Sequence, residues 1–184
     1  MNGEHSEEEI VKYARSGNRE AFGQLYQYYY QPIYRYVFYR VNHRQDTEDL
    51  TEKIFIKAWE SLPHYRGDAS FKSWIYRIAH TIVIDHYRTR KRPLSLNEAA
   101  SLVDGRLDLE TALMTQERIE QLRALLSRLS PLHQHVLTLR FINGLSTEET
   151  AQILERTVGS VRVLQHRALK AAHTLWTAQE VTND

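Results

Sequence analysis

One segment, from Ser70 to Arg92, constrains the fold more than any other part of this chain. Its large apolar residues recur at intervals of three and four, the period of a helix with one buried face; they are Phe71, Trp74, Ile75, Ile78 and Ile82. Ser70 precedes them and is suited to cap the amino terminus of the helix. The segment ends in a basic cluster that only Asp85 opposes. We therefore expect an amphipathic helix whose far end binds phosphate.

The remaining segments repeat this helical period, and none alternates apolar and polar residues as a half-buried strand would. The expected fold class is therefore all-α. Two helices begin with the spacing of a capping box, one at Ser6 and Glu9 and the other at Ser146 and Glu149. Pro32 lies inside an aromatic-rich helix, where it predicts either a kink or a neighbouring helix that replaces the lost hydrogen bond.

A further helix is expected from Asp46 to Leu62, because Pro63 prevents its continuation. Apolar residues cover two of its sides, with Leu50 and Ile54 on one side and Phe55 and Trp59 on the next. A helix that is apolar over so wide an arc is either buried on two sides or lends one side to a partner.

The charge of the chain is divided unevenly along its 184 residues. The net charge is only +1, but residues 1–92 carry 15 basic and 12 acidic side chains, residues 93–116 carry 1 and 4, and residues 117–184 carry 8 and 7. The acidic middle segment has no clean periodicity and contains Pro93 and Gly105. We therefore expect two small helical domains, 1–92 and 117–184, joined by a flexible linker at 93–116.

Several classes of protein are excluded by what the sequence lacks. Cysteine is absent, which excludes disulfides, thiolate catalysis and cysteine-ligated zinc. No apolar run has membrane-spanning length, and the first residues, MNGEHSEEEI, are acidic where a signal peptide would be basic. We expect a soluble cytoplasmic protein with no membrane insertion.

Nine histidines raise the alternative of a metal-dependent hydrolase. Its ligands would have to share one helix face, but His80 and His86 are about 600° apart at ~100° per residue, and His133 and His135 point to opposite sides. We therefore expect neither a metal nor another cofactor, and no catalytic activity.

The carboxyl-terminal part has the pattern of a helix-turn-helix. A short helix follows the capping box at Ser146, a connection of about three residues begins at Glu155, and Thr157 or Ser160 can cap the next helix. That second helix carries no acidic residue between Ser160 and Trp176, and its basic and polar side chains suit bases and phosphates. The alternative is an ordinary helical hairpin with a basic exposed face.

Several ordered motifs then identify a family. DTEDLTEKIFIKAW, FKSWIYRIAHTIVIDHYRTRKRP and LSPLHQHVLTLRFINGLSTEETAQIL followed by VGSVRVLQHRAL together resemble the extracytoplasmic-function (ECF) sigma factors of bacterial RNA polymerase. The resemblance covers residues from about 10 to 176. It implies that 1–92 is the domain of the second conserved sigma region and 117–184 that of the fourth.

The resemblance also implies partners and the residues that meet them. The helix from Asp46 would dock on the clamp helices of the largest polymerase subunit, through Asp46, Asp49, Glu52, Lys53 and Phe55. Core RNA polymerase, including its beta subunit, and promoter DNA would be the partners. The resemblance allows an anti-sigma factor as well, although no residue identifies one.

Two sets of DNA-binding residues follow from the same resemblance. The set expected to read and open the minus-ten element is Arg66, Ser70, Phe71, Arg77, His80, Thr81, Arg88, Arg90, Lys91 and Arg92. The set expected to read the minus-thirty-five element is Ser160, Arg162, Gln165, His166, Arg167 and Lys170. Several positions depart from the family pattern: Thr81 replaces a common Asn, His80 a frequent Arg and Glu155 a frequent Gly, and Val163-Leu164-Gln165 replaces a more frequent Ser-Arg-Leu.

The expected function is that of an alternative sigma factor, which binds core polymerase and directs promoter-specific initiation. A stand-alone helix-turn-helix regulator that never contacts polymerase is the alternative. The aromatic helix and basic helix of the amino-terminal half argue against it, because they would form an unusual effector domain.

Overall fold

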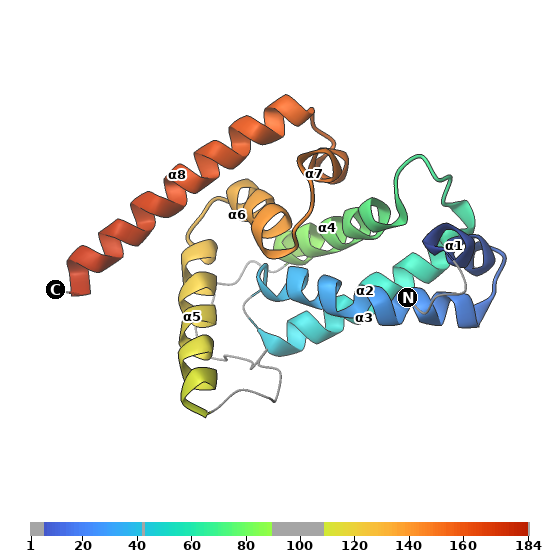
Figure 1. Cartoon of the computed structure of the whole chain (residues 1–184), viewed down its shortest axis with the longest axis horizontal. Helices are drawn as coiled ribbons and strands as arrows, with labels where there is room; N and C mark the ends of the chain where they lie inside the picture. The colour runs from blue at the N-terminus through green and yellow to red at the C-terminus, as the bar shows by residue number, and fades with distance from the viewer. Residues whose placement is uncertain (1–5, 42, 90–108, 184) are drawn as a thin grey trace.

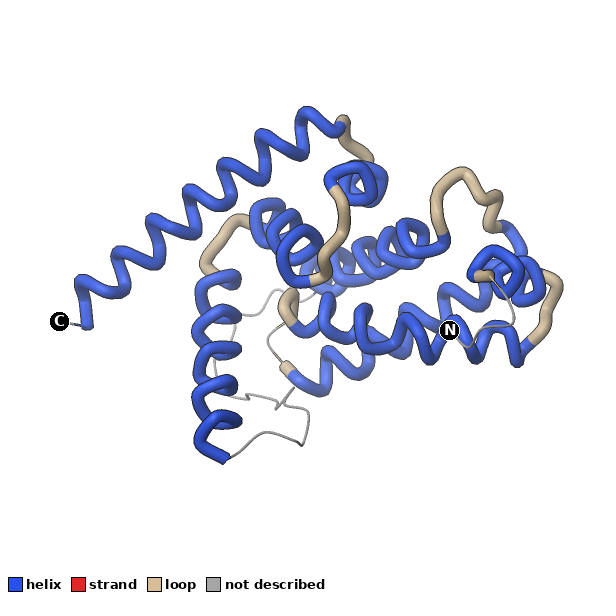
Figure 2. The backbone as a smooth tube through the Cα atoms, viewed as in Figure 1, coloured by secondary structure: helices blue, strands red, loops and turns tan. Residues whose placement is uncertain are grey.

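The described part of the protein consists of helices and the loops between them, without strands (Figure 2). The structure is a computed structural model, and it describes residues 6–41, 43–89 and 109–183. The all-α prediction is therefore confirmed. Within these ranges no helix is both long enough and apolar enough to cross a membrane.

The amino-terminal half forms from segments that carry their own start signals. Ser6 and Glu9 form the expected capping box of the first helix, and Asn18 caps the second by accepting a hydrogen bond from the Ala21 amide at 3.0 Å. The elements described up to residue 89 are α1 (Glu7–Arg15), α2 (Arg19–Phe38), α3 (Arg44–Ser61), the 3₁₀ turn η1 (Leu62–His64) and α4 (Phe71–Thr89).

Pro32 does not interrupt α2, which is helical on both sides of it. Because proline has no amide hydrogen, the carbonyl that it leaves without a donor is that of Tyr28. The neighbouring contact is instead to the carbonyl of Pro32 itself, which accepts a hydrogen bond from Asn143 Nδ2 at 2.8 Å. A side chain from the carboxyl-terminal half thus reaches the middle of α2.

The carboxyl-terminal half begins earlier than the sequence pattern suggested. Its first helix starts at Leu109, inside the segment 93–116 that was expected as linker. Residues 109–116, LETALMTQ, are mostly strong helix formers, so they extend a helix once the stripe that follows is packed. The elements described in this half are α5 (Leu109–Ser127), α6 (Pro131–Leu137), the π-turn η2 (Thr138–Ile142), α7 (Thr147–Leu154) and α8 (Val158–Asn183).

The two halves share their cores. Leu139, Leu145 and Ile153, all fully buried, belong to the same apolar cluster as the interior of α1 to α4. Conversely, Phe38 and Tyr39 at the end of α2 belong to the cluster of α5 to α8. Figure 1 shows α6 and α7 beside α4, whereas α8 runs outward to the carboxyl terminus. The carboxyl-terminal half is therefore packed against α4.

Candidate nucleic-acid interface

The residues expected to bind polymerase lie on α3 with different degrees of exposure. Asp49, Glu52 and Lys53 are exposed along one face of the helix. Asp46 is largely covered, and its carboxylate lies 3.8 Å from Nε2 of His86 on α4. Phe55 is only 4% exposed, so its side chain is not presented to a partner in this structure.

Both apolar sides of α3 are covered by the chain itself. Leu50 and Ile54 are buried in the amino-terminal core. Phe55 packs edge-on against Tyr26 of α2, with ring centroids 4.7 Å apart, and Trp59 lies 4.9 Å from Phe22. The wide apolar arc of this helix is thus explained by burial on two sides.

The start of α4 and the loop before it present few free side chains. Ser70 caps α4, since its Oγ accepts a hydrogen bond from the Ser73 amide at 3.1 Å, as expected. Arg66 is exposed on the loop. Phe71 is 3% exposed and packs against Tyr29, so it is part of the core and not a platform for a base.

The polar face of α4 is largely engaged by the carboxyl-terminal half. Arg77 Nη2 donates to the Gln152 carbonyl of α7 at 2.9 Å, and the His80 ring stacks on His135 of α6 with centroids 3.9 Å apart. Thr81 remains exposed and donates only to the Arg77 carbonyl of its own helix. The sequence alone gave no sign that Arg77 and His80 meet the other half.

The basic end of α4 is described only in part. Arg88 is exposed, and its guanidinium lies 3.8 Å from the carboxylate of Asp85. Arg90, Lys91 and Arg92 lie outside the described residues.

A groove of about 680 Å³ lies between α3 and α4. Its lining combines three cations and two carboxylates with apolar side chains: Lys53, Lys57, Arg77, Glu60, Asp85, Ile56, Trp74 and Ile78. Ile56 is 60% exposed there, although large apolar side chains are usually covered. Such a lining suits a strand of nucleic acid, whose phosphates need cations and whose bases need apolar contact.

A buried polar group joins α2 to α6. Arg40 is 2% exposed and donates from Nη1 to the Pro131 carbonyl at 2.9 Å and to Gln134 Oε1 at 3.3 Å. The Tyr36 hydroxyl is 2.8 Å from Nε2 of His135. These residues were not selected from the sequence, although a single arginine inside the apolar run YVFYRV is a signal of a buried cation.

Both stacked imidazoles are neutral. Burial, and secondarily the charge of Arg40, lowers the pKa of His80 from 6.5 to about 4. Burial also holds the pKa of His135 well below 6.5, with further contributions from His80 and Arg40. Among the described residues no group of His, Asp and Glu side chains is placed to hold a metal ion.

The helix-turn-helix is formed by α7 and α8. Ser146 and Glu149 make the expected capping box, and Thr157 Oγ1 accepts a hydrogen bond from the Ser160 amide at 3.2 Å. Glu155 ends α7 in the left-handed region, with φ of 52°, where glycine is usual. Glu155, which replaces the Gly frequent in the family, therefore has a strained backbone conformation.

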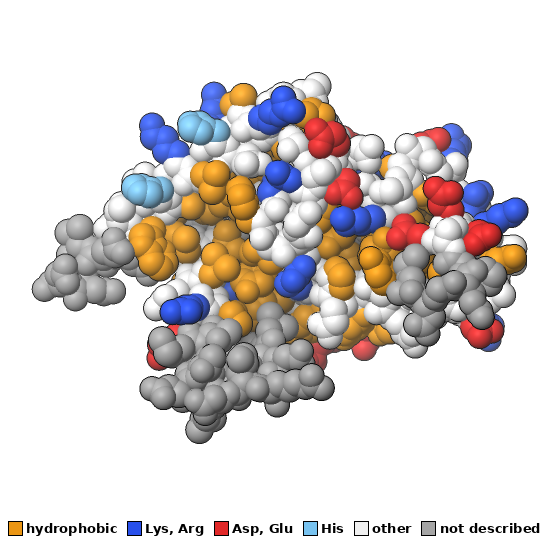
Figure 3. Space-filling model, viewed as in Figure 1, with side chains coloured by type: hydrophobic (Ala, Val, Ile, Leu, Met, Phe, Trp, Pro, Cys, Tyr) orange, Lys and Arg blue, Asp and Glu red, His pale blue; other side chains and the backbone are white. Residues whose placement is uncertain are grey.

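The outward face of α8 is open. Arg162, His166, Arg167 and Lys170 are exposed, and Ser160 is partly exposed beside them. Gln165 is held in place, because its Oε1 accepts a hydrogen bond from Arg140 Nε at 2.9 Å. Figure 3 shows Lys, Arg and His side chains along the edge of the molecule that α8 forms. This face meets the requirements of a helix that enters a DNA groove.

Comparison with known proteins matches both halves of the chain. The family model described as Sigma-70 region 2 matches residues 25–93, and the one described as Sigma-70, region 4 matches residues 119–171. The chain is 35% identical over 154 residues to the RNA polymerase sigma factor YlaC of Bacillus subtilis, covering 82% of this chain and 89% of YlaC. It is 32% identical over 166 residues to the ECF RNA polymerase sigma factor BldN of Streptomyces coelicolor, covering 88% of this chain but only 62% of BldN.

Two solved structures share the arrangement of helices. CnrH, in complex with the cytosolic domain of CnrY, gives a TM-score of 0.72 with 25% identity, covering 92% of this chain and 96% of CnrH. The sigma factor RpoE of Bartonella quintana, in complex with the anti-sigma factor NepR, gives a TM-score of 0.68 over 85% of this chain and 96% of RpoE. At 17% identity the second likeness shows the fold alone.

Proposed function

Since this chain belongs to the sigma-70 family of RNA polymerase sigma factors, within the ECF group, we propose that it works by tethered recognition of two promoter elements. It is an alternative sigma factor, which binds core RNA polymerase and directs promoter-specific transcription initiation. Polymerase holds the two DNA-reading helices at a fixed spacing, so that modest contacts at each element combine into useful affinity.

The polymerase contact that we propose lies on α3. Asp49, Glu52 and Lys53 share an exposed face that leaves the core undisturbed, which suits docking on the clamp helices of the largest subunit. Phe55 and Trp59 support this face from beneath. The carboxyl-terminal half contacts the beta subunit in the same complex.

The minus-ten contact that we propose lies on α4 and the loop before it. Strand opening requires capture of an unstacked base together with cations along its backbone. The groove between α3 and α4 supplies apolar walls at Trp74 and Ile78, and Arg77 and Thr81 supply charge and hydrogen bonds. Arg66 and Arg88 extend the basic surface at the two ends of the helix.

The minus-thirty-five contact that we propose lies on α8, which enters the major groove. Arg162 and Arg167 are exposed five positions apart, with no acidic residue between Ser160 and Trp176, so each can reach a guanine edge or a phosphate. A bidentate arginine–guanine pair is worth about 1–3 kcal/mol of discrimination. The exposed cationic face of α8, within the segment that matches region 4, is the observation that carries the proposal.

We further propose that the chain has no catalytic activity of its own, needs no cofactor and acts in the cytoplasm with the polymerase. We also propose a protein partner of the anti-sigma kind, because CnrH, which is 25% identical to this chain, forms a complex with the cytosolic domain of CnrY.

Run-off transcription with purified core polymerase and a library of genomic promoters tests the function. The full chain should associate with core enzyme and produce discrete promoter-specific transcripts that core enzyme alone does not produce. Tight binding of the free chain to a duplex operator, without association with core enzyme, would instead support the stand-alone regulator.

A further inference from the structure

Val163 lies at the centre of the outward face of α8. Val161 and Ala168 are fully buried beneath the helix, and Ala172 packs into the same cluster. At about 100° per residue, Val163 points to the opposite side from these residues, and 52% of it is exposed. A single exposed valine is ordinary on a protein surface, so its position is the informative feature.

The residues that surround Val163 on this face are polar or small. They are Gly159 and Ser160 in the turn before it, and His166, Arg167 and Lys170 in the turns after it. Within residues 158–168, all of which the structure describes, Val163 is the one large apolar side chain that is exposed. A helix that enters a groove brings the centre of its outward face nearest to the base edges, while its flanks meet the backbone.

The surface beside Val163 is hollowed. A cavity of about 370 Å³ is lined by Val163 and by two leucines, Leu132 of α6 and Leu164, and also by Arg156 and Arg167. No acidic side chain lines it. An apolar floor between two guanidinium groups suits a base edge that carries a methyl group and lies between the phosphates of a DNA strand.

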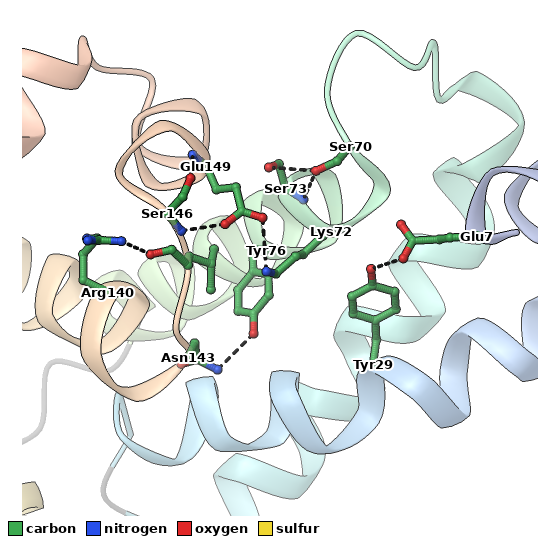
Figure 4. Close-up of polar contacts among 11 residues, drawn as sticks. Glu7, Tyr29, Ser70, Lys72, Ser73, Tyr76, Arg140, Asn143, Ser146 and Glu149 are labelled. Carbon is green, nitrogen blue, oxygen red and sulfur yellow. Dashed lines mark hydrogen bonds and ion pairs between the residues drawn. The ribbon is translucent and has the colours of Figure 1, made fainter. Parts of the chain in front are cut away.

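Arg140 fixes the rotation of α8 about its axis. It donates from Nε to Oε1 of Gln165 at 2.9 Å and from Nη1 to the carbonyl of Leu145, which precedes α7 (Figure 4). Gln165 is two positions after Val163 and is therefore about 200° away around the helix. The glutamine that replaces the more frequent Leu thus holds Val163 outward.

We propose that Val163 determines a preference for thymine within the minus-thirty-five element, by packing against the C5-methyl group of that base in the major groove. The inference deepens the proposed function and rests on it, because it requires α8 to enter this groove. The thymine methyl is the apolar group that base edges present there, beside hydrogen-bond donors and acceptors.

The choice of valine explains the selectivity. Valine has no donor or acceptor in its side chain, so a polar base edge pressed against it would lose hydrogen bonds to water without replacement. Serine, which is more frequent in the family at this position, can hydrogen-bond to several base edges and would not select the methyl group.

Transcription from promoters with a randomised minus-thirty-five element measures the base preference. Polymerase carrying the full chain should favour thymine about two- to fivefold at one position, the effect of burying roughly one methyl group. Val163→Ser should lose the preference at that position alone. Val163→Thr retains one methyl group and should retain part of the preference.

A matched variant controls for the loss of apolar surface on α8. Leu169→Ser changes another exposed apolar residue, which is 44% exposed and lies about 120° around the helix from Val163. It should keep the preference for thymine. Because Val163 is exposed, thermal unfolding of Val163→Ser should match that of the parent chain.

Deoxyuridine gives the sharpest test, because its base differs from thymine only by the absence of the methyl group. Placing it at the selected position should reduce transcription by the parent chain about two- to fivefold and leave transcription by Val163→Ser unchanged. An equal response of the two chains would overturn the proposal, as would a parent chain that prefers thymine at no position.

The remaining outcomes separate this inference from the proposed function. If Val163→Ser changed the affinity for core polymerase but not the base preference, Val163 would contact protein, and the inference alone would fall. If transcription did not depend on the minus-thirty-five element at all, the proposed role of α8 would fall together with the inference.

Discussion

The two helices that carry the DNA-reading residues are presented in opposite ways. On α8, Arg162 and Arg167 face outward with no ion pair in the described part of the chain. On α4, Arg77 and His80 are engaged by α7 and α6. An exposed cation with no partner can meet DNA at any time, whereas Arg77 must first leave its contacts with α7. The comparison separates a permanent reading surface from a conditional one.

The largest effect is expected on the open surface. Replacing Arg162 and Arg167 together with alanine should reduce promoter-specific run-off transcription about a hundredfold, because each arginine contributes about 1–3 kcal/mol of base discrimination. The matched control is Arg19→Ala, which removes an exposed cation from α2. Equal transcription by the double variant and the control would show that α8 is not the reading surface.

The next effect concerns the buried cation that joins the halves. Arg40→Ala removes two hydrogen bonds and leaves a cavity, and should lower the free energy of unfolding by about 2–4 kcal/mol, measured by urea denaturation. Arg44→Ala, which removes an exposed arginine paired with Glu48, should leave the urea midpoint nearly unchanged. A similar small change in both variants would mean that Arg40 does not hold the halves together.

Low pH should destabilise the contact of α4 with α6 more than the exposed face of α8. His80 and His135 are neutral when buried, but in the unfolded chain they titrate near their ordinary pKa of 6.5. The unfolded state therefore binds more protons below pH 6.5, so their contribution is fully present above that pH and is lost as the pH falls towards about 4. Urea midpoints measured between pH 7.5 and 4.5 give the dependence of the free energy of unfolding on pH. His80→Gln should reduce this dependence, whereas His166→Gln, on the exposed face of α8, should leave it unchanged. Equal dependence in the two variants would contradict the role of His80.

The smallest effect is expected at the left-handed residue that links the two surfaces. Glu155→Gly relieves the strain of a positive φ and should raise the free energy of unfolding by about 0.5–1 kcal/mol. Gln152→Gly, on an exposed helical position of the same helix, should lower it by about 1 kcal/mol. Thermal unfolding distinguishes the two signs. Destabilisation by both substitutions would mean that the contact of Glu155 with Arg77 outweighs the strain.

Local signals in the sequence located the elements well. The capping boxes at Ser6 and Ser146 and the cap at Ser70 form as expected. These features depend on hydrogen bonds between residues about three positions apart, so a short stretch of sequence contains all the partners. The start of α5 at Leu109 differs from the expected linker, because this helix depends on the packing of residues further along, such as Leu126 and Leu129.

Among the site residues, too, exposure that depends on local helical spacing could be predicted. Exposure of Arg162 and Arg167 on α8 follows from helical periodicity, which the sequence contains. The burial of Phe55 and Phe71 also fits apolar side chains at helical spacing, although both had been expected to contact partners. The roles assigned to the polymerase-binding and DNA-binding residues stay predictions, to be tested by the variants above.

By itself, the sequence determined the helices, their caps and the family, because these depend on residue spacing and on ordered motifs. Only the tertiary structure decided that Arg77 meets α7, that His80 stacks on His135 and that Asn143 reaches Pro32. These partners are 75, 55 and 111 positions apart in the chain, so no local pattern relates them. Their contact arises from the packing of one half on the other, which buries apolar side chains from both in common clusters.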